Sequence, residues 1–212
     1  MSLKVAVIGA NGKSGQALVN ESLKRGFAVT AIVRGENKTK APEAIIKDVF
    51  ALTSEDLTKF DVVFDAFGVW TIEEMPKHPE HIKHLAQILA NSNTRLLVVG
   101  GAGTLFLDKE HTQMLMQSPD FPESYMPVAT ATGKALAEMR KHPEVKWTYF
   151  SPAADFRADG PATGKYTLGG EEFIVNSKGE SVVSYLDFAQ AMVDEAVANK
   201  HPQERVTVVA DY

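Results

Sequence analysis

Strand-like and helix-like segments alternate along this 212-residue chain, and no other feature constrains the fold as strongly. Short apolar runs rich in branched residues, such as residues 3–8 and 28–33, are typical of strands buried on both faces. Residues 14–25 instead repeat their apolar side chains at helical spacing, and Gly26 follows where a left-handed helix cap belongs. Alternating strands and helices favour a mostly parallel sheet that is covered on both faces.

The same patterns predict the remaining elements. We expect strands at residues 3–8, 28–33, 44–47, 61–67, 95–99, 146–150 and 205–209. We expect helices at residues 14–25, 54–59, 79–90, 128–141 and 184–199, the last of them capped by Ser184. Right-handed crossovers then give an α/β fold, a single doubly wound Rossmann domain over residues 1–212.

Two long segments, residues 104–127 and 153–183, break this rhythm. Loops of this length inside one domain are usually functional. Both follow the carboxyl ends of predicted strands, where ligands bind in this architecture. We therefore expect both to form small loops on the substrate side.

Composition excludes several classes of function. The chain has 22 Lys and Arg against 27 Asp and Glu, a net charge of −5, so we expect no nucleic-acid partner. It has no cysteine, which excludes disulfides, thiolate catalysis and cysteine-ligated metals. We see neither a targeting segment nor a membrane span, so we expect a cytoplasmic protein without a membrane partner.

The clearest motif is Gly9-Ala10-Asn11-Gly12-Lys13-Ser14-Gly15, which follows a predicted strand and opens a predicted helix. Glycines let the backbone approach a pyrophosphate, and the helix amino terminus offers free N–H groups. Asn11 replaces the usual middle glycine. The motif predicts dinucleotide binding, the alternative being a purely structural turn.

The end of the second strand indicates which dinucleotide binds. An acidic residue there binds the ribose of NAD, whereas an arginine accommodates the 2′-phosphate of NADP. Here the strand ends in Arg34, and Lys38 could assist, although Glu36 lies between them. We therefore expect NADP(H) to be preferred over NAD(H).

Other strand ends supply further candidates for cofactor contact. Asp48 could meet the adenine edge or simply form a turn. Small residues in Ala66-Phe67-Gly68 leave room for the middle of the cofactor. Gly100, Gly101 and Gly103 suggest close backbone approach to a ligand, and the hydroxyl of Thr104 could lie near the nicotinamide.

The glycine motif, Arg34, the Val-Val-Gly-Gly-Ala-Gly run at 98–103 and Ser151-Pro152 resemble the atypical short-chain dehydrogenase/reductases. The chain is most similar to their NAD(P)H-binding, NmrA-like members of the NADH-flavin reductase type, and more distantly to biliverdin reductase B. This resemblance implies that Gly68 and Gly101 line the cofactor, that Ser151 and Pro152 border the nicotinamide, and that Thr104 replaces a serine beside it.

One departure from that superfamily bears on the chemistry. Typical members use Tyr-x-x-x-Lys, in which lysine lowers the tyrosine pKa. Here Thr130 precedes Lys134 by four residues, and Tyr125 lies nine residues before it. The usual proton donor is therefore missing, which fits hydride transfer to a flavin, a quinone or a linear tetrapyrrole. It also fits a non-catalytic NADP sensor that acts on a protein partner, and it argues against an epimerase.

Several other residues have competing interpretations. His78, His81 and His84 share a predicted helix, and we expect a solvated face with no metal site. Tyr166 and Tyr185 could donate protons, but a core or lid role is the simpler interpretation. The Met and aromatic residues of 104–127 suit a cover for a flavin substrate, a homodimer surface or ordinary packing.

Overall fold

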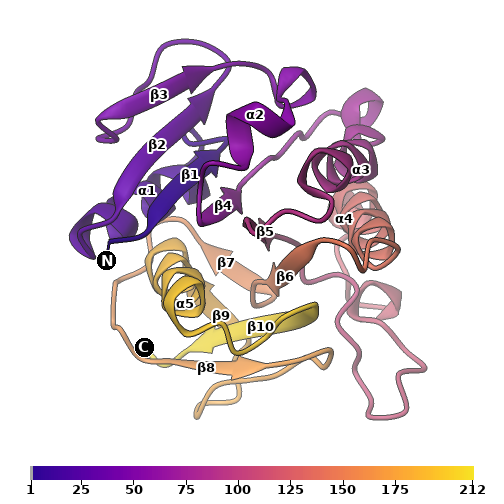
Figure 1. Ribbon diagram of the computed structural model, residues 1–212. Coiled ribbons are helices and arrows are strands. Elements are labelled where there is room, and N and C mark those ends of the chain that lie inside the picture. Colours follow the sequence, from indigo (N-terminus) through magenta and orange to yellow (C-terminus); the bar gives the residue numbers. More distant parts are fainter. Residues whose placement is uncertain (1) are drawn as a thin grey trace.

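The computed structural model describes residues 2–212, which form one eight-stranded sheet with helices on both faces (Figure 1). The strand order is β3-β2-β1-β4-β5-β6-β10-β8. The parallel strands are β1 (Lys4–Ile8), β2 (Ala28–Val33), β3 (Glu43–Ile46), β4 (Val62–Asp65), β5 (Arg95–Val99), β6 (Lys146–Ser151) and β10 (Glu204–Ala210). The predicted doubly wound α/β fold is confirmed.

The direction of winding reverses at β1, which pairs with β2 on one side and with β4 on the other. In such sheets the crevice outside the carboxyl ends of the strands at this switch point is the ligand site. The glycine motif leaves β1 at this end, so the fold places it where a ligand binds.

The helices form two layers. On one face lie α1 (Lys13–Lys24) and α5 (Tyr185–Ala198). On the other lie α2 (Ser54–Leu57), α3 (Lys77–Leu89) and α4 (Met126–Met139). Successive residues of β1 enter the two cores in turn, with Val5 and Val7 in one and Ala6 and Ile8 in the other. This explains why the strand is an unbroken apolar run.

Most differences from the predicted elements are at boundaries. The helix α4 begins at Met126 because Pro127 fits the first turn, where its missing N–H costs nothing. The predicted loop 153–183 contains three short strands: β7 (Asp155–Arg157) pairs in parallel with β9 (Val182–Ser184), and β8 (Tyr166–Gly169) runs antiparallel to β10. The predicted cap is present, since the Ser184 hydroxyl accepts from the Asp187 N–H at 3.0 Å.

Four 3-10 turns complete the described part of the chain, residues 2–212: η1 (Val49–Ala51), η2 (Ile72–Glu74), η3 (Leu115–Gln117) and η4 (Glu123–Tyr125). Within residues 2–212, no helix has both the length and the apolar character needed to cross a bilayer.

Candidate functional site

The β1–α1 turn contains three glycines in close backbone packing. Gly9 has φ +69°, and a Cβ there would lie 2.5 Å from the carbonyl oxygen of Ala66. A Cβ on Gly15 would lie 2.3 Å from the Gly9 carbonyl oxygen. A Cβ on Gly12 would meet only that same oxygen, at 3.2 Å, and otherwise open space. Gly9 and Gly15 are therefore required by the fold, whereas Gly12 faces outward from the turn.

The amino terminus of α1 is left open behind this turn. Its N-cap is Gly12, no side chain caps it, and no acidic residue occupies its first turn. The first N–H groups of a helix have no partner within the helix, and the helix dipole makes this end positive. With Lys13 and Ser14 in the first turn, the geometry suits a phosphate or pyrophosphate.

Asn11 links the glycine turn to the loop after β2. Its Nδ2 donates to the Glu36 carbonyl at 2.8 Å, and its Oδ1 accepts from the Lys38 N–H at 2.8 Å. The loop that carries Arg34 and Lys38 is thereby held against the turn. The Asn11 side chain thus explains why the middle glycine of the usual motif is absent here.

Arg34 is exposed in the loop after β2. The pKa of Glu74 in the segment after β4 is lowered, chiefly by hydrogen bonds from Lys77 and Thr71 and to a smaller extent by the charge of Arg34.

Asp48 has the turn-forming geometry that was one of its two interpretations. Its Oδ1 accepts from the Phe50 N–H at 3.0 Å and caps η1. Phe50 is itself partly exposed at the carboxyl end of β3.

The histidines of α3 overturn the expected solvated face. His78 and His81 are buried, and only His84 is half-exposed. Their Nε2 atoms contact the Val69 carbonyl at 3.2 Å, the Asp65 carboxylate at 2.8 Å and the Leu52 carbonyl at 3.0 Å, respectively. Helical spacing alone does not show that loops after β3 and β4 cover these side chains, whose ring nitrogens then need polar partners.

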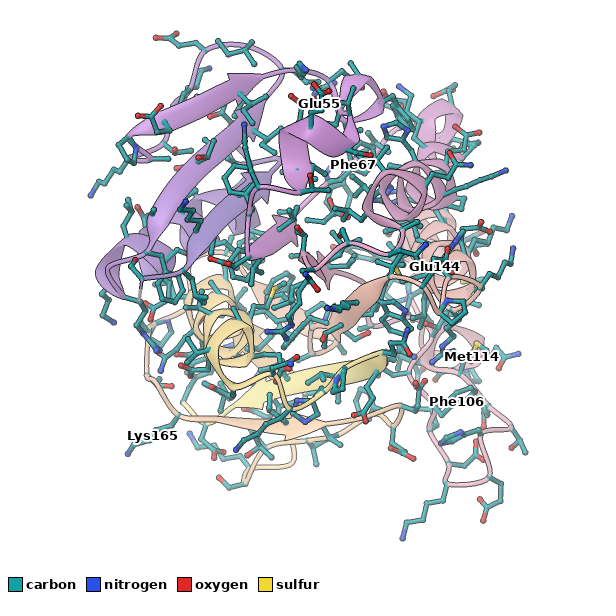
Figure 2. All side chains as sticks on the ribbon, viewed as in Figure 1. Glu55, Phe67, Phe106, Met114, Glu144 and Lys165 are labelled. Atoms are coloured by element: carbon teal, nitrogen blue, oxygen red, sulfur yellow. The ribbon has the colours of Figure 1, made fainter. Side chains whose placement is uncertain are left out.

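The buried Asp65–His81 pair shapes the end of β4. Asp65 Oδ1 accepts from the Phe67 N–H at 3.0 Å, and the Phe67 ring stacks on the His81 ring at 4.2 Å. Figure 2 shows Phe67 beside α3. Ala66 and Gly68 continue from this anchor past the glycine turn, with Gly68 exposed. Within residues 2–212, no three His, Asp or Glu side chains gather as a metal site requires.

The glycines after β5 make room for protein. A Cβ on Gly100 would lie 2.0 Å from the Tyr149 ring, and a Cβ on Gly101 would lie 2.5 Å from the Thr132 hydroxyl. Gly103 likewise approaches Ala129, at 2.5 Å. The backbone at these glycines does approach other atoms closely, as predicted. The atoms that it approaches, however, belong to β6 and α4 of the protein itself.

Arg205 joins the predicted nicotinamide-side residues, and the sequence interpretation missed it. From β10, its guanidinium donates to Ser151 Oγ at 2.8 Å and to the carbonyl and hydroxyl of Thr104 at 2.8 and 3.1 Å. Ser151 and Pro152 are buried, and Thr104 is half-buried. The sequence did contain a signal for this role, because Arg205 stands near the start of a largely apolar predicted strand.

Aromatic residues meet at the starts of α4 and α5. Each of these helices precedes a strand parallel to β1, so each begins at the carboxyl end of the sheet. Tyr185 packs on Phe156 with ring centroids 4.0 Å apart. Burial raises the pKa of Tyr185, and the charge of Tyr125 raises it further. Tyr125 itself is 57% exposed.

More apolar side chains are exposed near the carboxyl ends of the strands. Trp70 and Ile72, each 72% exposed, follow β4, and Met126 and Leu186 lie in the first turns of α4 and α5. Exposed apolar side chains at the carboxyl ends of the strands, the end at which such sheets bind ligands, favour a small-molecule site there.

The segment 104–127 divides between two locations. Phe106 forms isolated β-bridges with Met114 and with Glu172. Its N–H donates to the Glu171 carbonyl at 3.0 Å, and its carbonyl accepts from the Phe173 N–H at 2.7 Å. The two long segments are thus joined to each other. In Figures 1 and 2 the chain between Phe106 and Met114 forms a loop that extends away from the sheet at the lower right. After this loop the segment returns to the turn that follows β5, where the Met116 N–H donates to the Gly103 carbonyl at 2.8 Å, and it then leads through η4 into α4.

The position of the superfamily tyrosine is occupied by Thr130, one turn before Lys134 in α4. The Tyr166 hydroxyl hydrogen-bonds to Asp194. The pKa of Tyr166 is raised chiefly by burial and next by this hydrogen bond with the carboxylate. Tyr166 therefore has the structural role that was the simpler interpretation.

Comparison with known proteins identifies the family. A family model described as NAD(P)H-binding matches residues 9–199. The uncharacterized protein YwnB of Bacillus subtilis is 44% identical over 212 residues, 99% of each chain. The structure of SP1627 from Streptococcus pneumoniae, named as a proposed NADH-flavin reductase, has 47% identity and a TM-score of 0.97, with 99% of this chain and 100% of that chain covered.

A further structure is that of a proposed epimerase from Bacteroides thetaiotaomicron. It has 35% identity and a TM-score of 0.83, with 100% of this chain and 99% of that chain covered. These matches confirm the family resemblance seen in the sequence motifs. The chain belongs to the NAD(P)H-binding family of Rossmann-fold proteins.

Proposed function

We propose that this chain is an NADPH-dependent oxidoreductase that reduces a planar, apolar acceptor such as a flavin or a quinone, with residues 1–212 acting as one domain. When bound, the reduced nicotinamide supplies the hydride. The main support for this proposal is the uncapped amino terminus of α1 behind the glycine turn. The name of SP1627, at 47% identity, supports the same activity.

The binding residues follow the path of the strand ends. Gly9, Gly12, Lys13, Ser14 and Gly15 would hold the pyrophosphate, with Asn11 fixing the turn. Arg34 and Lys38 would take the 2′-phosphate, which is the reason to expect NADP(H) over NAD(H). The adenine would be bordered by Asp48. The middle of the cofactor would lie against Ala66, Phe67 and Gly68. The nicotinamide would be bordered by Gly100, Gly101, Thr104, Ser151 and Pro152.

The acceptor would lie against the aromatic residues at the starts of α4 and α5. Tyr125, Tyr185 and Phe156 offer flat apolar surfaces of the kind that a planar ring system stacks on. The chain would bind and orient the acceptor and exclude water. With Thr130 in the place of the superfamily tyrosine, the acceptor would take its proton from water.

The test is turnover with a defined series of acceptors. Purified protein is mixed with NADPH or NADH and with FMN, riboflavin, a quinone or biliverdin, and loss of reduced nicotinamide absorbance is followed. We expect saturable oxidation that Gly12→Val abolishes, because the added side chain enters the phosphate space. Gly170→Val is the matched control, since its Cβ would also meet little, the nearest atom being 3.9 Å away.

A second candidate function is a sensor that binds NADP and regulates a protein partner without turnover. The observation that favours it is the absence of tyrosine at position 130. Tight NADPH binding with no oxidation on any acceptor in the series would support the sensor and contradict the reductase.

A further inference from the structure

We infer that Arg205 is a positioning residue whose buried guanidinium fixes the turn after β5 and the end of β6 for the nicotinamide half of the cofactor. The inference rests on the proposed function, which puts Gly101, Thr104 and Ser151 beside the nicotinamide. Arg205 contacts all three, although it lies more than fifty residues from each of them in sequence.

The guanidinium donates four hydrogen bonds, and each of its three nitrogens takes part. Nε donates to Ser151 Oγ at 2.8 Å, and Nη1 donates to the Thr104 carbonyl at 2.8 Å. Nη2 donates to Thr104 Oγ1 at 3.1 Å and to the Gly101 carbonyl at 3.4 Å. Nη1 also pairs with Glu171 Oε2 at 3.5 Å. The N–H donors of arginine lie in a rigid plane, so the four hydrogen-bonded oxygen atoms are held in one fixed arrangement.

Burial makes this arrangement stiff. The Arg205 side chain is 1% exposed, and its oxygen partners come from two strand ends and from the segment after β8. A side chain with this many polar contacts cannot move without leaving a buried donor unsatisfied, which is costly. The Gly100–Thr104 turn has no regular secondary structure of its own, so Arg205 supplies the cross-link that sets its position.

The contacts also orient two hydroxyl groups. Both Ser151 Oγ and Thr104 Oγ1 accept hydrogen bonds from the guanidinium. A hydroxyl that accepts from a cation keeps its own hydrogen free to donate on another side. Of the two, the half-exposed Thr104 is the one that a bound ligand can reach.

Lysine at position 205 keeps the charge beside Glu171 but offers three donors from one point in place of a planar set of five. Arg205→Lys should therefore loosen the turn without leaving an uncompensated charge. Arg95→Lys is a matched control. Arg95 is also a largely buried strand arginine, paired with Glu195 at 3.2 Å and bonded to the carbonyls of Glu195 and Ala196, at the opposite end of the sheet.

The experiment compares two ligands by calorimetric titration of the wild type and both variants. The ligands are NADPH and 2′-phospho-ADP-ribose, which is the cofactor without its nicotinamide. Loss of one or two charge-assisted hydrogen bonds predicts about tenfold weaker NADPH binding by Arg205→Lys. Binding of 2′-phospho-ADP-ribose should be unchanged in both variants, and Arg95→Lys should lower only the melting temperature.

Equal weakening of both ligands, or no weakening of either, would overturn the inference while leaving the proposed function intact. If wild-type protein binds neither NADPH nor NADH, the proposed function fails and the inference falls with it. Should Arg205→Lys not fold, Thr104→Val removes one acceptor and leaves the guanidinium in place. It is expected to weaken NADPH severalfold and to spare 2′-phospho-ADP-ribose, and no change in either would refute the positioning role.

Discussion

Replacing Asp65 tests whether its buried pair with His81 holds the end of β4. The carboxylate accepts from His81 Nε2 at 2.8 Å and from the Phe67 N–H at 3.0 Å. His81 Nδ1 lies 3.1 Å from the Lys77 carbonyl, which is also an acceptor. Both ring nitrogens of this buried side chain therefore face oxygen atoms, and Asp65 is the partner on one side.

Asp65→Ala removes both carboxylate oxygens and leaves His81 Nε2 and the Phe67 N–H buried without a partner. Each buried polar group left unsatisfied costs about 1–3 kcal/mol, so we expect a loss of about 4 kcal/mol in the free energy of unfolding. Asp65→Asn keeps the shape. Its oxygen can accept from Phe67 and its amide can donate to a neutral His81, which keeps Nδ1–H on Lys77, so we expect a loss of only about 1 kcal/mol.

Urea denaturation followed by circular dichroism measures both losses. A drop of about 4 kcal/mol is a large part of the stability of an ordinary domain, so Asp65→Ala should also unfold at a visibly lower temperature. Equal losses in the two variants, or an alanine variant within about 1 kcal/mol of wild type, would refute the reasoning about the pair.

Three further predictions concern the cofactor turn and pH. Arg34→Ala should weaken NADPH binding roughly 10- to 100-fold and leave NADH binding nearly unchanged, because only the 2′-phosphate is lost as a partner; an equal effect on both nucleotides in a titration would contradict the assignment. Gly15→Ala should destabilise the chain in thermal melts far more than Gly12→Ala, since the added Cβ would lie 2.3 Å rather than 3.2 Å from the Gly9 carbonyl oxygen; similar melting temperatures would count against this geometry. Burial lowers the pKa of His78 below 6.5, so the unfolded chain binds its proton first and stability should fall as pH drops below that value. His78→Gln, which keeps a donor for the Val69 carbonyl, should show a shallower fall in denaturant midpoints over the same pH range, and an unchanged slope would exclude His78 as a source.

The sequence predicted the elements whose signal is long and regular. The parallel strands are continuous apolar runs, and the glycine turn sits between a strand and a helix, so both could be placed from local pattern alone. The strands of residues 153–183 could not be placed, because β7 and β9 have three residues each and β8 is a four-residue edge strand whose two middle residues are both exposed. Three residues carry too little periodicity to distinguish a strand from a loop.

The candidate site shows a similar division. Spacing placed His78 and His81 on one helix face but could not tell that loops after β3 and β4 cover it. Glycine at position 100 indicated a missing side chain without revealing that the Tyr149 ring fills the space. Arg205 contacts Thr104 and Ser151 across the sheet, and only the register of β10 against β6 brings them together. Contacts set by tertiary register have no local signature in one sequence.

The proposed activity is hydride delivery from a nicotinamide cofactor bound at the glycine turn. It is tested by a titration of wild type and Gly12→Val with NADPH, followed in the same sample by addition of FMN or a quinone. We expect saturable binding to wild type, none to Gly12→Val, and loss of reduced nicotinamide absorbance once the acceptor is present. Equal binding by both proteins, or binding without oxidation on any acceptor, would contradict it.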